Sequence, residues 1–173
     1  GVDLSGEYTY DPVFSPRIGL NYMYYDGLHL FLSAGHGYSA PSVEETLLPE
    51  GELNTDLKPE TGWNYEIGTK GHFWDHNLFF DLSVYHIRID NMLVTKREAE
   101  DIFTAINAGK TSHTGLESYF RYNKILGSNI LNKIVLWGAF TISDNHFVDF
   151  TDDGVNHSGN ILPGIPLNML NSG

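Results

Sequence analysis

The sequence of 173 residues contains no cysteine, few cations and no long hydrophobic run. Without cysteine the chain forms no disulfide, no thiolate metal site and no cysteine nucleophile. It has 10 Lys and Arg against 22 Asp and Glu, which gives a formal net charge of -12. This excess argues against nucleic acid as a partner, because the phosphates would be repelled, and it disfavours peripheral binding to anionic lipid. No apolar run reaches the ~20 residues that a membrane-spanning helix needs.

Aromatic residues and glycine are abundant instead. The chain has 10 Tyr, 10 Phe, 3 Trp and 18 Gly, although its mean hydropathy is only -0.23. An acidic chain of this kind is typical of a β-barrel with a polar interior. A secreted β-sandwich would have a similar composition, so composition alone leaves both architectures open.

Alternation of apolar and polar side chains with a period of two is the strongest signal in the chain. The clearest example runs from Trp63 to Phe73, with Trp63 and Tyr65 at one end, Phe73 and Trp74 at the other, and smaller residues between them. At ~3.3 Å per residue this segment spans ~33 Å, and a tilt of ~40° reduces its height to ~25 Å. That is the height of an outer-membrane apolar band with an aromatic girdle at each edge.

The same alternation predicts further strands. They lie at residues 16–24, 28–40, 78–90, 102–122 and 133–150, and residues 162–170 form the start of a last strand. Phe31 interrupts the alternation of the second. Beyond Val84 the phase changes, so that Tyr85 and Ile87 are apolar and His86 is polar. A β-bulge in the strand, or its exit from the bilayer, would explain the change.

Short and long connections alternate along the chain. Residues 25–27 and 74–77 are tight turns, whereas residues 42–60 and 150–160 are long, polar and acidic. Outer-membrane barrels have short turns on one side and long loops on the other, and a sandwich has no reason to follow that rule. We therefore predict an all-β chain that forms an antiparallel transmembrane β-barrel segment of about seven strands.

Several segments also resemble motifs of TonB-dependent outer-membrane receptors, and they occur in the family's order. They are FSPRIGLNY at 14–22, GYSAPS at 37–42, NTDLKPE at 54–60, NYEIGTKG at 64–71, NAGK at 107–110, GLE at 115–117 and GNILPGIP at 159–166. Together they cover nearly the whole chain. In the second motif, Tyr38 and Ser39 replace the usual Phe and Arg.

The resemblance implies a twenty-two-stranded barrel closed by a plug, with ligand bound at the extracellular face and TonB acting on the plug. Residues 1–173 would be part of that barrel, because we find no plug, TonB box or aromatic C-terminal residue in them and the chain starts Gly1-Val2-Asp3. The expected function is energised uptake of a scarce nutrient, above all a ferric siderophore or other iron chelate. The expected partners are an extracellular small molecule, TonB through the plug, and outer-membrane lipid of a Gram-negative bacterium.

Two other functions remain open at this point: a small outer-membrane adhesion or structural barrel, and a soluble carbohydrate-binding β-sandwich. The sequence has no Gly-x-Ser-x-Gly, His-Glu-x-x-His or phosphate-binding loop, so we expect no enzyme and no cofactor. Haem receptors of the family carry a His between the boxes that resemble FRAP and NPNL, and residues 41–54 contain none.

Lys96 and Arg97 are the candidate ligand-binding residues. They follow Leu93 in an expected outer loop and could attract an anionic iron chelate. Exposed cations offset by Glu98, Glu100 and Asp101 would give the same pattern. The acidic loop 44–60 could bind Ca²⁺, but it matches no EF-hand, and the eight His are not spaced as ligands, with His29 and His72 on a polar face and His76 in a turn. We therefore predict no metal site.

Two hairpin registers follow from the alternation. If residues 25–27 form a three-residue loop, Tyr22 pairs with Leu30 and Tyr24 with Leu28, and Gly27 takes positive φ in a G1 bulge. In the second hairpin, paired numbers should sum to ~151 if no bulge intervenes. Lys70 and Asp81 would then be opposite each other, on one face and within salt-bridge reach.

Overall fold

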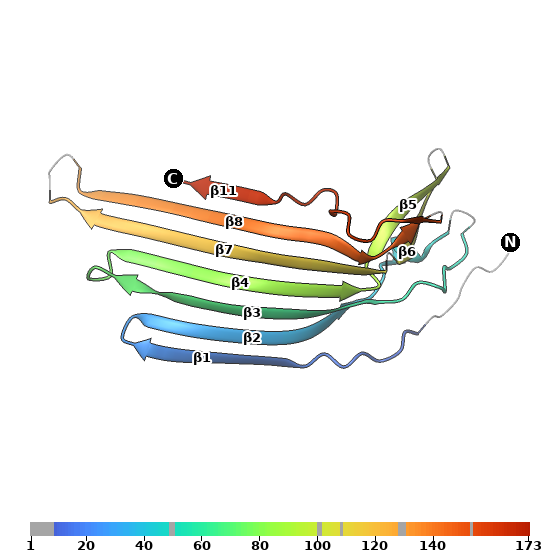
Figure 1. The fold of residues 1–173 in the computed structure, drawn as a ribbon, viewed down its shortest axis with the longest axis horizontal. Coiled ribbons are helices and arrows are strands. Elements are labelled where there is room, and N and C mark those ends of the chain that lie inside the picture. The colour runs from blue at the N-terminus through green and yellow to red at the C-terminus, as the bar shows by residue number, and fades with distance from the viewer. Residues whose placement is uncertain (1–8, 49–50, 100–101, 108, 128–130, 153) are drawn as a thin grey trace.

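A computed structural model describes residues 9–48, 51–99, 102–107, 109–127, 131–152 and 154–173, without the side chains of 97–99 and 102–103. The chain forms one long antiparallel sheet of seven strands in the order β1-β2-β3-β4-β7-β8-β11 (Figure 1). The strands are β1 (Arg17–Tyr25), β2 (Leu28–Ser39), β3 (Glu60–Phe73), β4 (Leu78–Asp90), β7 (Lys110–Ile125), β8 (Lys133–Asp149) and β11 (Asn168–Ser172). This architecture confirms the predicted antiparallel segment of about seven strands.

The sheet is open. Among the described residues, β1 pairs only with β2 and β11 only with β8. The two edge strands, β1 and β11, therefore each keep one row of unpaired backbone donors and acceptors, which a closed barrel would pair with further strands. No helix among the described residues is both long and apolar enough to cross a membrane.

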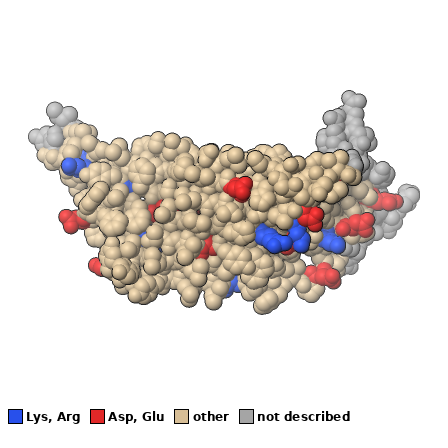
Figure 2. Space-filling view, viewed as in Figure 1, with Lys and Arg blue, Asp and Glu red and all other residues tan. Residues whose placement is uncertain are grey.

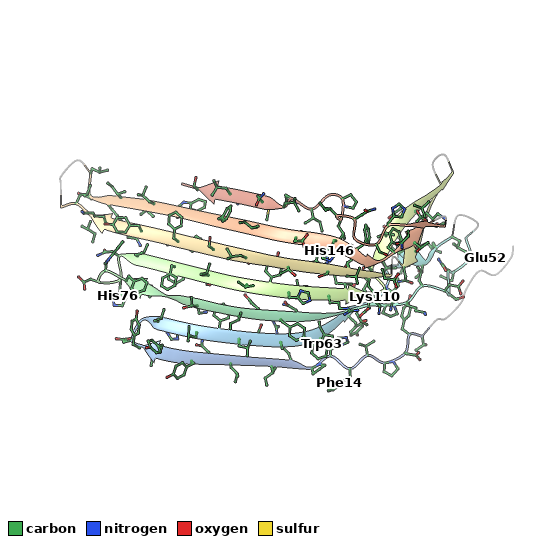
Figure 3. All side chains as sticks on the ribbon, viewed as in Figure 1. Phe14, Glu52, Trp63, His76, Lys110 and His146 are labelled. Carbon is green, nitrogen blue, oxygen red and sulfur yellow. The ribbon has the colours of Figure 1, made fainter. Side chains whose placement is uncertain are left out.

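The connections sort by length onto the two ends of the sheet. The turns after β1 and β3 lie at one end, the turn end, and Figure 1 shows the long connections together at the other, the loop end. The loop end carries the helix α1 (Val43–Thr46), the hairpin of β5 (Leu93–Ala99) and β6 (Ile102–Asn107), and the short pair of β9 (Thr151–Asp152) and β10 (Val155–Asn156). In the side-chain view, His76 lies at the turn end and Glu52 at the loop end (Figure 3).

Strand pairing assigns every strand residue to one of two faces. We call the face that carries Ile67 the outer face and the face that carries Glu66 the inner face. Pairing places mostly apolar side chains on the middle of the outer face: Ile18, Leu20, Tyr22, Leu30, Leu32, Ile67, Leu82, Val84, Leu116, Phe140 and Ile142. Figure 2 shows one side of the sheet on which the middle of the strands carries little charge.

The first hairpin partly follows the prediction. Tyr22 pairs with Leu30, and Gly27 has φ +91°, as predicted. At the end of the hairpin, however, Tyr25 rather than Tyr24 pairs with Leu28, and a bulge lies between Met23 and Tyr25. The turn itself is therefore the two-residue Asp26-Gly27, and the extra residue at Tyr24 keeps Tyr22 and Leu30 on one face.

The second hairpin has the predicted register throughout. Phe73 pairs with Leu78 and Lys70 with Asp81, and the pairing continues to Thr61 and Asp90 without a register shift. The phase change beyond Val84 is therefore no bulge. His86 and Arg88 point to the same face as Leu82, so the apolar stretch of the outer face ends between Val84 and His86.

Three predictions need correction. Residues 102–122 form two strands rather than one, because the chain turns at Gly109, which has φ +56°. The segment from Leu93, predicted to be an outer loop, is strand β5. The last strand starts at Asn168 instead of Leu162, because the stretch before it contains Pro163 and Pro166, which have no N–H to donate to a sheet.

Aromatic side chains cluster at both ends of the outer face. At the turn end, Phe73 stacks on Phe80 with ring centroids 5.1 Å apart. Toward the loop end, Trp63 stacks on Tyr65 at 5.8 Å, and Figure 3 shows Trp63 near that end of β3. These are the two aromatic groups that the sequence predicted for the segment from Trp63 to Phe73.

Candidate ligand-facing wall

Two adjoining hollows lie on the inner face toward the loop end, with volumes of about 350 and 400 Å³. They share Asn64, Ile87 and Ile89, and we call their common surface the upper wall. Strands β3 and β4 position these residues, because Asn64 pairs with Ile87. The upper wall thus combines apolar branched side chains with an amide, a mixture found in sites for organic ligands.

Polar groups surround the apolar centre of the upper wall. Arg17 lines the hollow on the β1 side, and Glu66, His113 and Asn145 line the hollow on the β7 side. The Oδ1 atom of Asn64 is buried and has no hydrogen-bond partner in the described structure. A buried acceptor without a donor costs free energy, so this oxygen is a local destabilising feature of the wall.

A chain of hydrogen bonds fixes the β7 side of the upper wall. His113 Nδ1 lies 2.9 Å from Asn145 Oδ1, Asn145 Nδ2 donates to Ser143 Oγ at 2.8 Å, and Ser143 Oγ donates to the carbonyl of Pro166 at 3.3 Å. Because the Asn145 oxygen can only accept, His113 must carry a proton on Nδ1, and its Nε2 lies 3.0 Å from the Thr111 hydroxyl. These hydrogen bonds connect the segment before β11 to the upper wall.

An acidic hollow of about 560 Å³ lies lower on the inner face. Its charged residues are Glu66, Asp81 and Glu117 against Lys70. The predicted Lys70–Asp81 ion pair is wrong: the two residues are opposite each other and line the same hollow, but they are not among the ion pairs of the described residues. The Lys70 ammonium lies instead over the Phe31 ring, 5.6 Å from its centroid, where the aromatic face attracts the cation.

The proposed ligand contacts lie on the β5–β6 hairpin. Lys96 is on β5, and its Nζ lies 3.7 Å from Asp152 Oδ1 of the β8–β11 connection. Arg97 belongs to the same strand, but its side chain lies outside the described residues. The structure therefore places Lys96 at the loop end, as expected, and gives it an acidic neighbour that the sequence did not reveal.

Three histidines lie where the sequence predicted. His29 and His72 lie on the inner face and His76 in the turn after β3, where the His72 and His76 rings are 5.3 Å apart. Within the part of the chain that the structure describes, no three His, Asp or Glu side chains gather in a way that could hold a metal ion.

Comparison with known protein families gives a match over almost the full chain. The family model described as "TonB dependent receptor-like, beta-barrel" matches residues 2–173. The chain belongs to this family. The resemblance carried by the short motifs is therefore confirmed, and the family is one of receptors and transporters rather than enzymes.

One curated relative of this receptor barrel is the "Ferric-pyoverdine M114 receptor PbuA" of Pseudomonas sp. (strain M114). The two are 25% identical over 121 residues, which cover 66% of this chain and 14% of the relative. The barrel chain thus matches about a seventh of the length of that relative.

Two family motifs meet at the loop end of the receptor barrel in a way that the sequence did not predict. Asn107 of the NAGK segment and Lys58 of the NTDLKPE segment form two hydrogen bonds to each other. Helix α1 has a capping box in which Ser42 and Glu45 bond each other's backbone, and the spacing Ser-x-x-Glu could have revealed it. The Asn107 bond had no sequence signal, because its partners are 49 residues apart.

Proposed function

We propose that this chain is part of the outer-membrane barrel of a receptor that takes up an iron chelate, most simply a ferric siderophore. The observation that carries this proposal is the match to the TonB-dependent receptor-like β-barrel family over residues 2–173. The relative named above is a ferric-pyoverdine receptor, which supports iron chelates as the ligand class.

The two faces of the sheet support a membrane location. The outer face has an apolar middle bounded by aromatic groups, which suits a bilayer with girdles at its two interfaces. The inner face carries Glu66, Lys70, Asp81 and Glu117, which suit a hydrated lumen. In this proposal the turn end is periplasmic and the loop end extracellular.

The upper wall and the connections at the loop end are the proposed ligand-facing surface. Lys96 and Arg97 are its proposed electrostatic contacts for an anionic chelate. Asp152 reduces the positive potential at Lys96, since the two head groups are 3.7 Å apart. The proposed partners beyond the ligand are outer-membrane lipid and TonB, which acts through the plug that the family resemblance implies.

The test uses the full-length receptor in a Gram-negative strain that lacks its own iron-chelate receptors. We expect radioactive iron to enter with ferric pyoverdine-type or ferric hydroxamate chelates, and entry to stop when TonB is deleted or a protonophore is added. A receptor that assembles in the outer membrane and yet takes up none of these chelates would contradict the proposal.

Two other functions make different predictions. A small adhesion or structural barrel would be encoded by a gene of about this length and would need no TonB. A soluble sandwich would remain in aqueous buffer without detergent. Neither is favoured by a specific observation, and the two unpaired edge strands of the described sheet do not fit a small closed barrel.

A further inference from the structure

The base of the β5–β6 hairpin is held on both strands by residues 58–60, where the β2–β3 connection joins β3. Leu93 and Asn107 are the register partners at this base. The Leu93 N–H donates to Glu60 Oε1 at 2.6 Å, while the Asn107 side chain accepts from Lys58 N at 2.9 Å and donates to Lys58 O at 2.9 Å. Residues 58–60 therefore form hydrogen bonds to both strands of a hairpin that is distant in sequence.

Asn107 also closes the corner where the chain leaves β4. Its Nδ2 donates a second bond, of 2.8 Å, to the carbonyl of Asn91. Asn91 has φ +58°, a left-handed conformation that Asn adopts more readily than most residues other than glycine, and its N–H donates to Gly109 O at 2.7 Å. One amide side chain thus links β4, the hairpin and the β2–β3 connection, and it uses both of its donors and its acceptor.

The β2–β3 connection has one more bond to the hairpin, and the start of the hairpin also contacts β8 and the β8–β11 connection. Asn54 Nδ2 donates to Ala105 O at 3.4 Å. Met92 and Val94 pack against Phe147 of β8 and Leu162 of the β8–β11 connection, which are 8% and 3% exposed. The Lys96–Asp152 ion pair also joins the hairpin to the β8–β11 connection.

We propose that Asn107 is a positioning residue that joins the β2–β3 connection, the corner at Asn91 and the β5–β6 hairpin into one preorganised body, which we call the rim. A ligand then meets a fixed surface and does not have to order loops, and this lowers the entropic cost of binding. Glu60, which grips Leu93, also lines a hollow of the upper wall, so the geometry of the rim is transmitted to that wall. Only the identity of the ligand rests on the proposed function.

The test measures rim geometry directly in the full-length receptor. Spin labels at Thr55 and Thr95, both exposed, report the distance between the β2–β3 connection and the hairpin. We expect one narrow distance distribution in the parent protein and a broad one in Asn107→Ala. If that variant fails to assemble, Asn107→Asp keeps the size and the acceptor, loses both donations, and should broaden the distribution in the same way.

Asn77→Ala is the matched control. Asn77 also bonds a backbone carbonyl, that of Trp74 at 2.8 Å, but in a turn at the opposite end of the sheet. Its loss should lower stability and leave the label distance unchanged. An unchanged distribution in the Asn107 variants, or equal broadening in Asn77→Ala, would overturn the proposal.

Ligand affinity gives a second readout, with ferric pyoverdine as the probe. Asn107→Ala should weaken its binding about tenfold, the effect of losing roughly 1.4 kcal/mol of preorganisation, and Asn77→Ala should leave it unchanged. Equal affinity in Asn107→Ala and the parent overturns the functional part of the proposal. If the parent binds no iron chelate, the proposed function fails, and the label distances still decide whether Asn107 holds the rim.

Discussion

Phe31 on β2 and Gly68 on β3 are directly paired residues, and the Phe31 ring fills the space where any larger side chain at position 68 would lie. This explains why Phe31 interrupts the alternation of its strand: a large ring covers a glycine on the inner face. The same ring lies under the Lys70 ammonium. A packing interaction and a cation–π contact thus replace the ion pair that the sequence suggested.

The first prediction concerns this pair. Gly68→Ala should lower the free energy of unfolding by about 1–3 kcal/mol, because the added Cβ overlaps the Phe31 ring. Phe31→Leu in the same background should recover part of the loss. A double-mutant cycle in lipid vesicles measures the coupling, and additive effects would show that the ring is not the obstacle.

A second prediction concerns the outer face. The Leu82 side chain is 39% exposed. Leu82→Arg should lower the free energy of unfolding by about 2–4 kcal/mol if the site lies near the bilayer midplane. Ile67→Arg should behave alike. His86→Arg, on the same face beyond the apolar stretch, should change stability by less than about 1 kcal/mol. Refolding of the full receptor into vesicles measures all three, and equal losses at Leu82 and His86 would contradict the boundary at Val84.

An inner-face substitution separates lipid exposure from packing. Ser83 is 6% exposed and lies on the inner face beside Leu82. Ser83→Arg should therefore destabilise through overpacking, by about 1–3 kcal/mol, in thick and thin bilayers alike. The loss at Leu82→Arg should instead vary with bilayer thickness, since it arises from contact with lipid. If the stability losses of Ser83→Arg and Leu82→Arg changed in the same way with bilayer thickness, the assignment of faces would be refuted.

A third prediction concerns the turn between β3 and β4. Trp74, Asp75 and His76 all have positive φ, of 52°, 53° and 65°, a conformation that costs residues with a side chain free energy. Asp75→Gly should raise the free energy of unfolding by about 0.5–1 kcal/mol, because glycine adopts this conformation without the steric penalty. Asp26, in the other hairpin turn, is not among the described residues with positive φ, and Asp26→Gly should give no gain.

The fourth prediction compares two glycines of positive φ. Gly109 has φ +56°, and a Cβ there would overlap the Asp149 carbonyl, so Gly109→Ala should destabilise by about 2–5 kcal/mol. Gly127 has φ +64° with open space around the Cβ position. Gly127→Ala should therefore lose only about 1–2 kcal/mol, the conformational penalty alone. Denaturant unfolding of both variants tests the difference, and equal losses would exclude the carbonyl contact.

The sequence by itself determined most of the long strands, their faces and the register of the β3–β4 hairpin, although it merged β6 and β7 into one strand. The physical reason is that a strand residue points to one face or the other, so a slip of one position would place Lys70 or Asp81 on the apolar side. The positive φ of Gly27 followed from the turn in the same way. The family motifs added an identity that local patterns could not give.

Only the tertiary structure decided how the loop end is built. The β5–β6 hairpin, the corner at Asn91 and the grip of Asn107 on Lys58 depend on contacts between residues far apart in a polar stretch without alternation. The contact of Lys70 could not be predicted from the sequence either. Its ammonium lies over Phe31, a residue of β2, rather than against Asp81 of the paired strand. Periodic burial fixes strands locally, whereas loop contacts arise only when distant segments are brought together by the completed sheet.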